Sequence, residues 1–164
     1  VSSRFSQARS RFACADWVSS NERTEIDMNT MKIAKLAQDY TKAWNSKSAE
    51  AVASFYAPDG EIVINKGEPW SGREQVRDMA AGFYADVPDL SLTCDDVRIS
   101  ENHVLFLWTF TGHDATTLRP LKIHGWEEWD LSDDLQVQSS RGWFDAQSYA
   151  QQAGTSKASP VPKL

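Results

Sequence analysis

The 164-residue sequence has few of the residues that mark several common protein classes. Its two cysteines, Cys14 and Cys94, lie far apart and match no metal-ligand spacing, so we expect two reduced thiols and no disulfide framework. No apolar run approaches the ~20 residues needed to cross a bilayer. The three histidines are scattered and no glycine-rich phosphate loop is present, so we expect no metal and no cofactor.

Charge and hydropathy narrow the class further. The net charge of −6 argues against nucleic acid or an anionic membrane as the main partner. A hydrophobic content of 41%, with seven tryptophans, is ample for the core of one domain. We therefore expect one cytoplasmic domain whose partner is a small molecule.

The two ends of the chain differ in composition from its middle. Arg4, Arg9 and Arg11 stand among serines, and no apolar segment follows them, so no secretory signal is expected. Residues 1–27 are interpreted as an N-terminal extension, either a non-native segment before a start at Met28 or Met31, or an arm of transit-peptide type. Residues 28–152 are the predicted domain. Residues 153–164 are rich in serine, proline and lysine and are predicted to be a tail.

Apolar stripes at helical spacing predict three helices in the first half of the domain. The first is capped by Thr30 and its stripe runs from Ile33 to Trp44. Ser48 is expected to cap a short second helix that carries Phe55 and Tyr56 inward. A third helix follows a predicted capping box of Ser71 and Glu74, and Pro88 ends it.

The second half of the domain is predicted to be β-structure. Four strands are expected at residues 90–99, 104–113, 121–131 and 137–144, a short one at 61–65, and a closing helix at 145–151. Helices followed by a strand meander indicate an α+β fold. We expect a curved antiparallel sheet wrapped around the three N-terminal helices, forming a cone that encloses a pocket.

Four segments resemble the nuclear-transport-factor-2-like superfamily, and within it the SnoaL-like polyketide cyclases. They are Ala-Trp-Asn at 43–45, Phe-Tyr-Ala-Pro-Asp-Gly at 55–60, Ser-Gly-Arg-Glu at 71–74 with Pro-Asp-Leu at 88–90, and Trp-Thr-Phe-Thr-Gly-His at 108–113 with Trp-Phe-Asp-Ala at 143–146. The resemblance spans about residues 31–152 and implies the ketosteroid isomerase-like cone. It does not settle function, because the superfamily includes cyclases, isomerases, dehydratases, hydrolases and non-catalytic binders.

Glu127 is the first candidate for chemistry. Alternation along residues 123–131 places it on the more apolar face of its strand, where it is the only charged residue. A carboxyl among apolar side chains loses hydration and its pKa rises, which suits it to proton transfer near neutral pH. The strand also resembles the one that brings a catalytic acid into the pocket of ketosteroid isomerases and cyclases. The alternative is a one-residue shift that exposes Glu127 and buries Glu128.

Tyr40 and Arg141 complete the predicted catalytic set. Tyr40 and Asn45 have the spacing of the ketosteroid isomerase helix that supplies an oxyanion-hole tyrosine, so a role in polarising a substrate oxygen is implied. The alternative for Tyr40 is a plain core residue. Arg141 is expected in the pocket beside Glu127, where it would lower the pKa of that carboxyl or bind an anionic group. Its alternative is a surface arginine at the sheet edge.

Two positions depart from the families that the chain resembles. The end of the first short strand, residues 62–65, has no acid where ketosteroid isomerases carry an aspartate base. Gly142 stands where polyketide cyclases carry an acid-base aspartate. Neither family's own mechanism is therefore expected here.

The aromatic side chains are expected to form a wall for a flat, apolar or aromatic ligand. The predicted ligand-binding residues are Trp44, Phe83, Trp108, Phe110, His113, Trp129 and Trp143. Three hypotheses follow: a cofactor-independent isomerase, lyase or hydrolase, a non-catalytic ligand-binding domain, and a dimerisation module. A homodimer is expected in each case, through the outer sheet face that carries His124 and Trp126.

Overall fold

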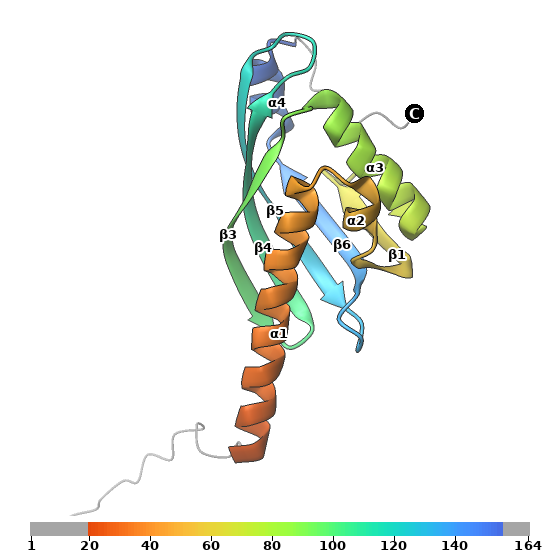
Figure 1. Ribbon diagram of the computed structural model, residues 1–164, viewed down its shortest axis with the longest axis vertical. Coiled ribbons are helices and arrows are strands. Elements are labelled where there is room, and N and C mark those ends of the chain that lie inside the picture. The colour runs from red at the N-terminus through yellow and green to blue at the C-terminus, as the bar shows by residue number, and fades with distance from the viewer. Residues whose placement is uncertain (1–19, 156–164) are drawn as a thin grey trace, which may run out of the picture.

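The computed structural model describes residues 20–155 of the chain (Figure 1). Three of the four helices lie in the first half and the last four strands in the second, which confirms the predicted α+β fold. The elements are α1 Ser20–Asn45, α2 Ala49–Ala53, β1 Tyr56–Ile64, β2 Trp70–Ser71, α3 Gly72–Asp86, β3 Ser91–Ser100, β4 His103–His113, β5 Pro120–Leu131, β6 Val137–Phe144 and α4 Ala146–Ala153.

The strands form one six-stranded sheet in the order β2-β1-β6-β5-β4-β3. The pairs β3–β4, β4–β5 and β5–β6 are antiparallel, as expected for a meander. The pair β1–β6 is parallel, so the sheet is mixed and not wholly antiparallel as predicted. A parallel pair requires a long crossover, which α3 and the three strands after it supply here.

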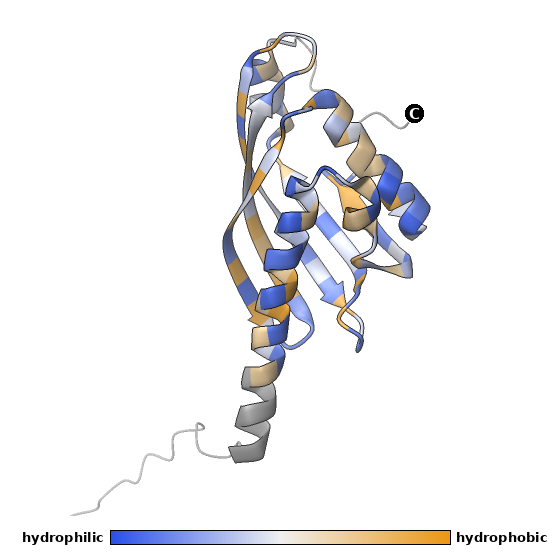
Figure 2. Ribbon diagram, viewed as in Figure 1, coloured by the Kyte–Doolittle hydropathy of each residue, from blue (hydrophilic) through white to orange (hydrophobic). Residues whose placement is uncertain are grey.

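The helices cover the inner face of the curved sheet. In Figure 1, α1 runs along β3 and β4 while α2 and α3 lie over β1 and β6. Figure 2 shows hydrophobic and hydrophilic residues on opposite flanks of α1. The buried stripe of α1 carries Ile33, Ala37, Tyr40 and Trp44, as the helical spacing predicted. Helices and sheet thus bury their apolar sides against one another.

One predicted helix start and one predicted capping box differ from the structure, whereas α3 begins directly after Ser71 as predicted. Thr30 lies inside α1, which begins at Ser20, because residues 20–29 contain no glycine or proline to stop the helix. Ser71 makes no side-chain capping bond, and its backbone N–H donates to Gln75 Oε1 at 3.0 Å. The reason is that Ser71 is a strand residue paired with Glu61, so the predicted capping box with Glu74 does not form. The cap at Ser48 is confirmed, since its hydroxyl accepts from the Ala51 N–H at 3.1 Å.

Strand β1 is longer than predicted and includes Tyr56, which was expected on a helix. The predicted turn at residues 57–60 instead forms an irregularity within the strand, where the register with β6 shifts. Gly60 is needed there, because a Cβ atom on it would lie 2.5 Å from the carbonyl oxygen of Val137. Tyr56, on the N-terminal side of the irregularity, is fully buried in the core.

No helix within residues 20–155 is both long and apolar enough to span a membrane. Cys94 is a free thiol, whereas Cys14 and most of the predicted tail lie outside the described residues. Helix α1 crosses the predicted boundary at residue 28, and the boundaries of the domain stay predictions.

Candidate active site

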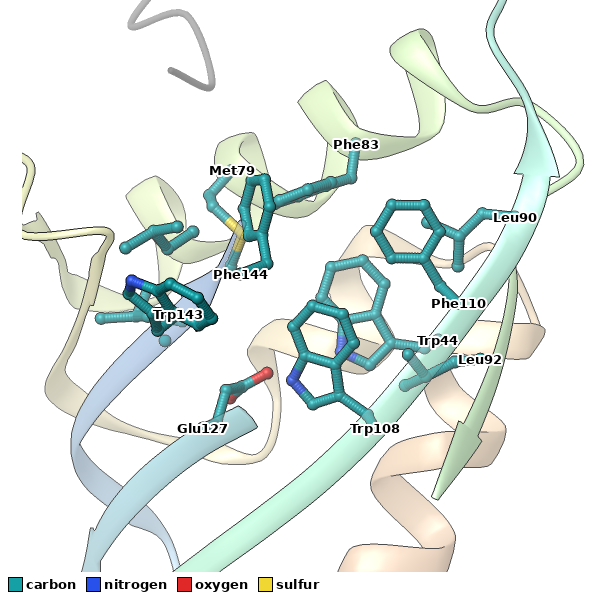
Figure 3. A pocket seen from close by; sticks show the side chains of 13 residues that line it. Trp44, Met79, Phe83, Leu90, Leu92, Trp108, Phe110, Glu127, Trp143 and Phe144 are labelled. Carbon is teal, nitrogen blue, oxygen red and sulfur yellow. The ribbon is translucent and has the colours of Figure 1, made fainter. Parts of the chain in front are cut away.

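A narrow cavity of about 40 Å³ lies between the helices and the inner face of the sheet (Figure 3). Four of the predicted ligand-binding residues line it: Trp44, Phe83, Trp108 and Phe110. Trp143 also borders it, although its ring stacks on Trp126 at the outer face of the sheet. The remaining wall is formed by aliphatic residues, Met79, Phe144 and Gly142. Glu127 is the one charged residue among those that line the cavity in the described part of the chain.

Glu127 is held by a set of buried donors. Only 7% of the surface of Glu127 is exposed. Oε2 accepts from four groups: Trp129 Nε1 at 2.8 Å, the Tyr40 and Ser140 hydroxyls at 3.2 Å each, and the Tyr56 hydroxyl at 3.5 Å. Oε1 has a single contact, with the Tyr40 hydroxyl at 3.3 Å. Oε2 is therefore saturated, and Oε1 is the oxygen with capacity left for a ligand.

Burial raises the pKa of Glu127, although the hydrogen bonds from Trp129, Tyr40, Ser140 and Tyr56 each lower it. The loss of hydration is the larger effect, so the carboxyl holds its proton more tightly than an exposed glutamate does. Burial, together with the charge of Glu127, also holds the pKa values of Tyr40 and Tyr56 well above the usual value for a phenol. Both phenols therefore remain protonated donors.

The raised pKa of Glu127 predicts a pH dependence of stability. The folded state holds a proton that the unfolded chain releases near the usual pKa of 4.5, so the free energy of unfolding falls as pH rises from there through the folded pKa. Glu127→Gln lacks this titration. Across this pH range we expect the free energy of unfolding of wild type to fall relative to that of the variant. The contributions of the other titratable groups are the same in both proteins and cancel when the two curves are subtracted. Urea unfolding at stepped pH measures it, and parallel curves for the two proteins would contradict it.

Strand alternation explains how the sequence brings Glu127 inside. Odd-numbered residues of β5 are buried from Leu121 to Leu131, so the alternative in which a shift buries Glu128 does not occur. Glu127 pairs across the sheet with Gly142. A Cβ atom on Gly142 would lie 3.7 Å from Glu127 Cγ, so the glycine leaves open space beside the carboxyl. Asn65, near the other missing aspartate, accepts from the Phe144 N–H at 3.0 Å and serves the backbone.

Arg141 does not lie beside Glu127, contrary to the prediction. Its neighbours Ser140 and Gly142 face inward, so alternation turns Arg141 to the outer face. There its Nε lies 3.1 Å from Glu128 Oε2 and holds the pKa of that carboxyl below its usual value. The surface alternative is the one that the structure shows, and Arg141 neither neutralises Glu127 nor binds an anion in the cavity.

Three other predicted residues lie away from the cavity wall. His113 is exposed and its Nδ1 pairs with Asp89 Oδ2 at 2.7 Å. Trp129 and Tyr40 are fully buried behind Glu127, so they contact the carboxyl and not a ligand. Tyr40 therefore positions Glu127, and the predicted polarisation of a substrate oxygen by this phenol does not fit the geometry.

Two residues of the Glu127 environment, Ser140 and Tyr56, were not predicted. Ser140 shares the alternating face of β6 with Gly142, so the same rule that placed Glu127 signals its position. Tyr56 carries no comparable signal, because its strand begins inside the segment that was expected to be helical. In the part of the chain that the structure describes, no cluster of three His, Cys, Asp or Glu side chains is arranged to hold a metal ion.

The sequence and the fold both match known proteins. The sequence model of the family described as "SnoaL-like domain" matches residues 37–138, which include α2, α3 and most of the sheet. This chain belongs to the SnoaL-like family. Among curated proteins, none matches this SnoaL-like chain.

Solved structures share the fold of this SnoaL-like domain. A protein of ketosteroid isomerase-like fold from Catenulispora acidiphila, in complex with trimethylamine, has a TM-score of 0.70 at 20% identity, covering 77% of this chain and 97% of its own. A proposed isomerase from Bacillus subtilis has a TM-score of 0.69 at 13% identity, covering 79% and 98%. A proposed SnoaL-like polyketide cyclase from Jannaschia sp. CCS1 has a TM-score of 0.66 at 14% identity, covering 79% and 92%. At these identities the likeness shows the fold alone.

Proposed function

We propose that this SnoaL-like protein is a cofactor-independent enzyme of the isomerase, lyase or hydrolase type that acts on a small apolar or aromatic molecule. The observation that carries the proposal is a buried carboxyl, Glu127, with one unsaturated oxygen at an otherwise apolar cavity. Burial raises the pKa of this carboxyl above that of an exposed glutamate, which favours its use as a general acid or base. The aromatic wall supplies the binding surface for a flat ligand.

In this proposal Glu127 is the catalytic acid–base group and its buried donors are positioning residues. Trp129 and Ser140 fix Oε2, which leaves Oε1 directed at the ligand. Tyr40 contacts both oxygens and links the carboxyl to α1. Because these groups are rigid and buried, the carboxyl needs little reorganisation when a proton moves.

The test compares wild type, Glu127→Gln and Glu128→Gln on a panel of apolar epoxides, enones and lactones, without added cofactor. Loss of turnover in Glu127→Gln alone supports the proposal. Equal turnover in all three contradicts it. Ligand binding without turnover by wild type supports the second candidate, a non-catalytic binding domain, which the absence of an acid at Gly142 and Asn65 favours.

We also propose that two copies pair through the outer sheet face. Trp126 and Trp143 are 39% and 41% exposed there and stack with ring centroids 4.6 Å apart. Exposed aromatic patches of this kind mark interaction sites. The patch is flanked by Arg141 and by the carboxyls of Glu128 and Asp130, so a two-fold axis can place each basic group near the acidic groups of the other copy.

For the pairing we expect sedimentation velocity at ten micromolar to show a dimer of the wild-type chain, and the double variant Trp126→Ser, Trp143→Ser to sediment as a monomer. Removing two large apolar rings takes away most of the contact that desolvation stabilises. Arg98→Ser, an exposed residue on the edge strand β3, is the control and is expected to leave the dimer intact. A wild-type monomer would contradict the pairing.

A further inference from the structure

Two buried indole N–H groups at the cavity have no acceptor. Trp44 and Trp108 are 7% and 8% exposed, and within the described residues neither Nε1 atom has a hydrogen-bond partner. The third buried tryptophan, Trp129, is different because its Nε1 donates to Glu127 at 2.8 Å. Buried donors are almost always paired, so two unpaired donors on the wall of one small cavity require an explanation.

The side chains around the two indoles do not supply the acceptor. The Trp44 ring meets Tyr40 edge to face, with centroids 6.3 Å apart. Burial raises the pKa of the Tyr40 phenol and the nearby Trp44 N–H opposes this rise, but the pair lacks hydrogen-bond geometry. The Trp108 ring stacks on Phe110, which has no acceptor. Figure 3 shows Trp44, Trp108 and Glu127 around the same space, with the Trp108 nitrogen on the ring edge turned toward Glu127.

The charge of the wall defines what kind of acceptor fits. No lysine, arginine or histidine lines the cavity in the described part of the chain, and the one titratable group there is Glu127. An anionic oxygen would be buried without a counter-charge and would face that carboxyl, which is unfavourable. An uncharged oxygen, such as a carbonyl, ether or epoxide oxygen, accepts from an indole N–H without this cost.

We propose that the cavity selects uncharged, flat molecules by their oxygen acceptor, which takes a hydrogen bond from Trp108 Nε1, with Trp44 Nε1 as a second donor. This inference rests on the proposed function in taking the cavity as the ligand site. It assigns the two tryptophans a role in polar recognition beyond apolar contact, and it places the ligand oxygen opposite Glu127. Glu127 Oε1 is then free to exchange its proton with another atom of the ligand.

The experiment uses three probes of one shape: indane, 1-indanone and indane-1-carboxylate. Binding to the full chain with 15N-labelled indoles is followed by NMR. We expect 1-indanone to bind about tenfold more tightly than indane, from one hydrogen bond that satisfies a buried donor. We expect the Trp108 indole N–H resonance to move downfield with 1-indanone and not with indane, and indane-1-carboxylate to bind most weakly at neutral pH.

Trp108→Phe keeps a ring and removes the donor, so we expect it to lose most of the tenfold preference while binding of indane stays within about threefold. Trp70→Phe removes an indole N–H on β2, at a residue that does not line the cavity, and is the matched control, expected to keep the preference. Equal binding of indane and 1-indanone by wild type, or tightest binding of the carboxylate, overturns the inference and leaves the role of Glu127 standing. If neither uncharged probe binds at millimolar concentration, this inference and the cavity as a ligand site both fail. The resonance shifts in wild type decide the matter even if Trp108→Phe does not fold.

Discussion

Replacing Glu127 with glutamine is expected to lower kcat by about 10²–10⁴-fold on any substrate that the protein converts, which is the usual contribution of a general acid or base. Glutamine has nearly the same shape, so the wall of the cavity is kept and KM should change little. Its amide carries no acidic proton, while its carbonyl oxygen can still accept from Trp129 Nε1 and the Ser140 hydroxyl in the place of Oε2. Steady-state kinetics at several pH values measures both parameters.

Glu128→Gln is the control, because it makes the same chemical change one residue away on the outer face. Glu128 pairs with Arg141 and His103 at the surface, where breaking such pairs changes stability little. Its kcat should stay within about twofold of wild type. A kcat for Glu127→Gln equal to that of Glu128→Gln would remove the carboxyl from the mechanism.

Gly125→Ala is expected to destabilise the fold by about 3 kcal/mol, at the upper end of what overpacking of a core costs. A Cβ atom on Gly125 would lie 2.4 Å from the carbonyl oxygen of Trp143 and 2.5 Å from two ring atoms of Trp108. The backbone of β6 cannot move away without breaking its pairing with β5, so the Trp108 ring and both strands must shift. Urea or thermal unfolding of purified protein gives the change directly.

Gly142→Ala provides the matched comparison on the neighbouring strand. A Cβ atom there would meet Ile64, Glu127 and Ile62 at 3.6–3.8 Å, which is ordinary contact. We expect the free energy of unfolding to be unchanged or slightly higher, since alanine loses less conformational freedom than glycine. The added methyl group reduces the space beside Glu127. Similar destabilisation by the two substitutions would contradict the packing described for Gly125.

The sequence predicts a helix or strand correctly where its apolar residues repeat with one clear period. Strand β6 begins and ends where the alternation predicted, and β3, β4 and β5 agree to within one residue at each end. The parallel pairing of β1 with β6 has no local signal, because it depends on contacts between distant segments. The start of α1 was missed for a different reason: Thr30 is a good capping residue, but no glycine or proline stands before it to end the helix.

In the candidate site too, the residues that could be placed from the sequence are those on strands with clear alternation. Alternation along β5 placed Glu127 inside, and the structure shows it there. Applied to β6, the same rule places Ser140 inward and Arg141 outward once Gly142 is taken to face the cavity, so the error at Arg141 could have been avoided. The roles of Tyr40 and Trp129 could not be derived in this way. Both side chains contact the carboxyl of Glu127 from the side away from the cavity, and only the packing of α1 on the sheet places them there.

The parallel pairing of β1 with β6 has a consequence for how the chain folds. Tyr56 pairs with Val137, so this contact closes a loop that contains α3 and most of the sheet, and contacts of such long range form slowly. Glu127 draws its partners from α1, β1 and β6 as well as from its own strand. During synthesis the carboxyl of Glu127 therefore lacks part of its set of hydrogen-bond donors until β6, the last strand, has been made. A chain that ends before Val137 leaves β1 and β5 with unpaired edges, which favours aggregation.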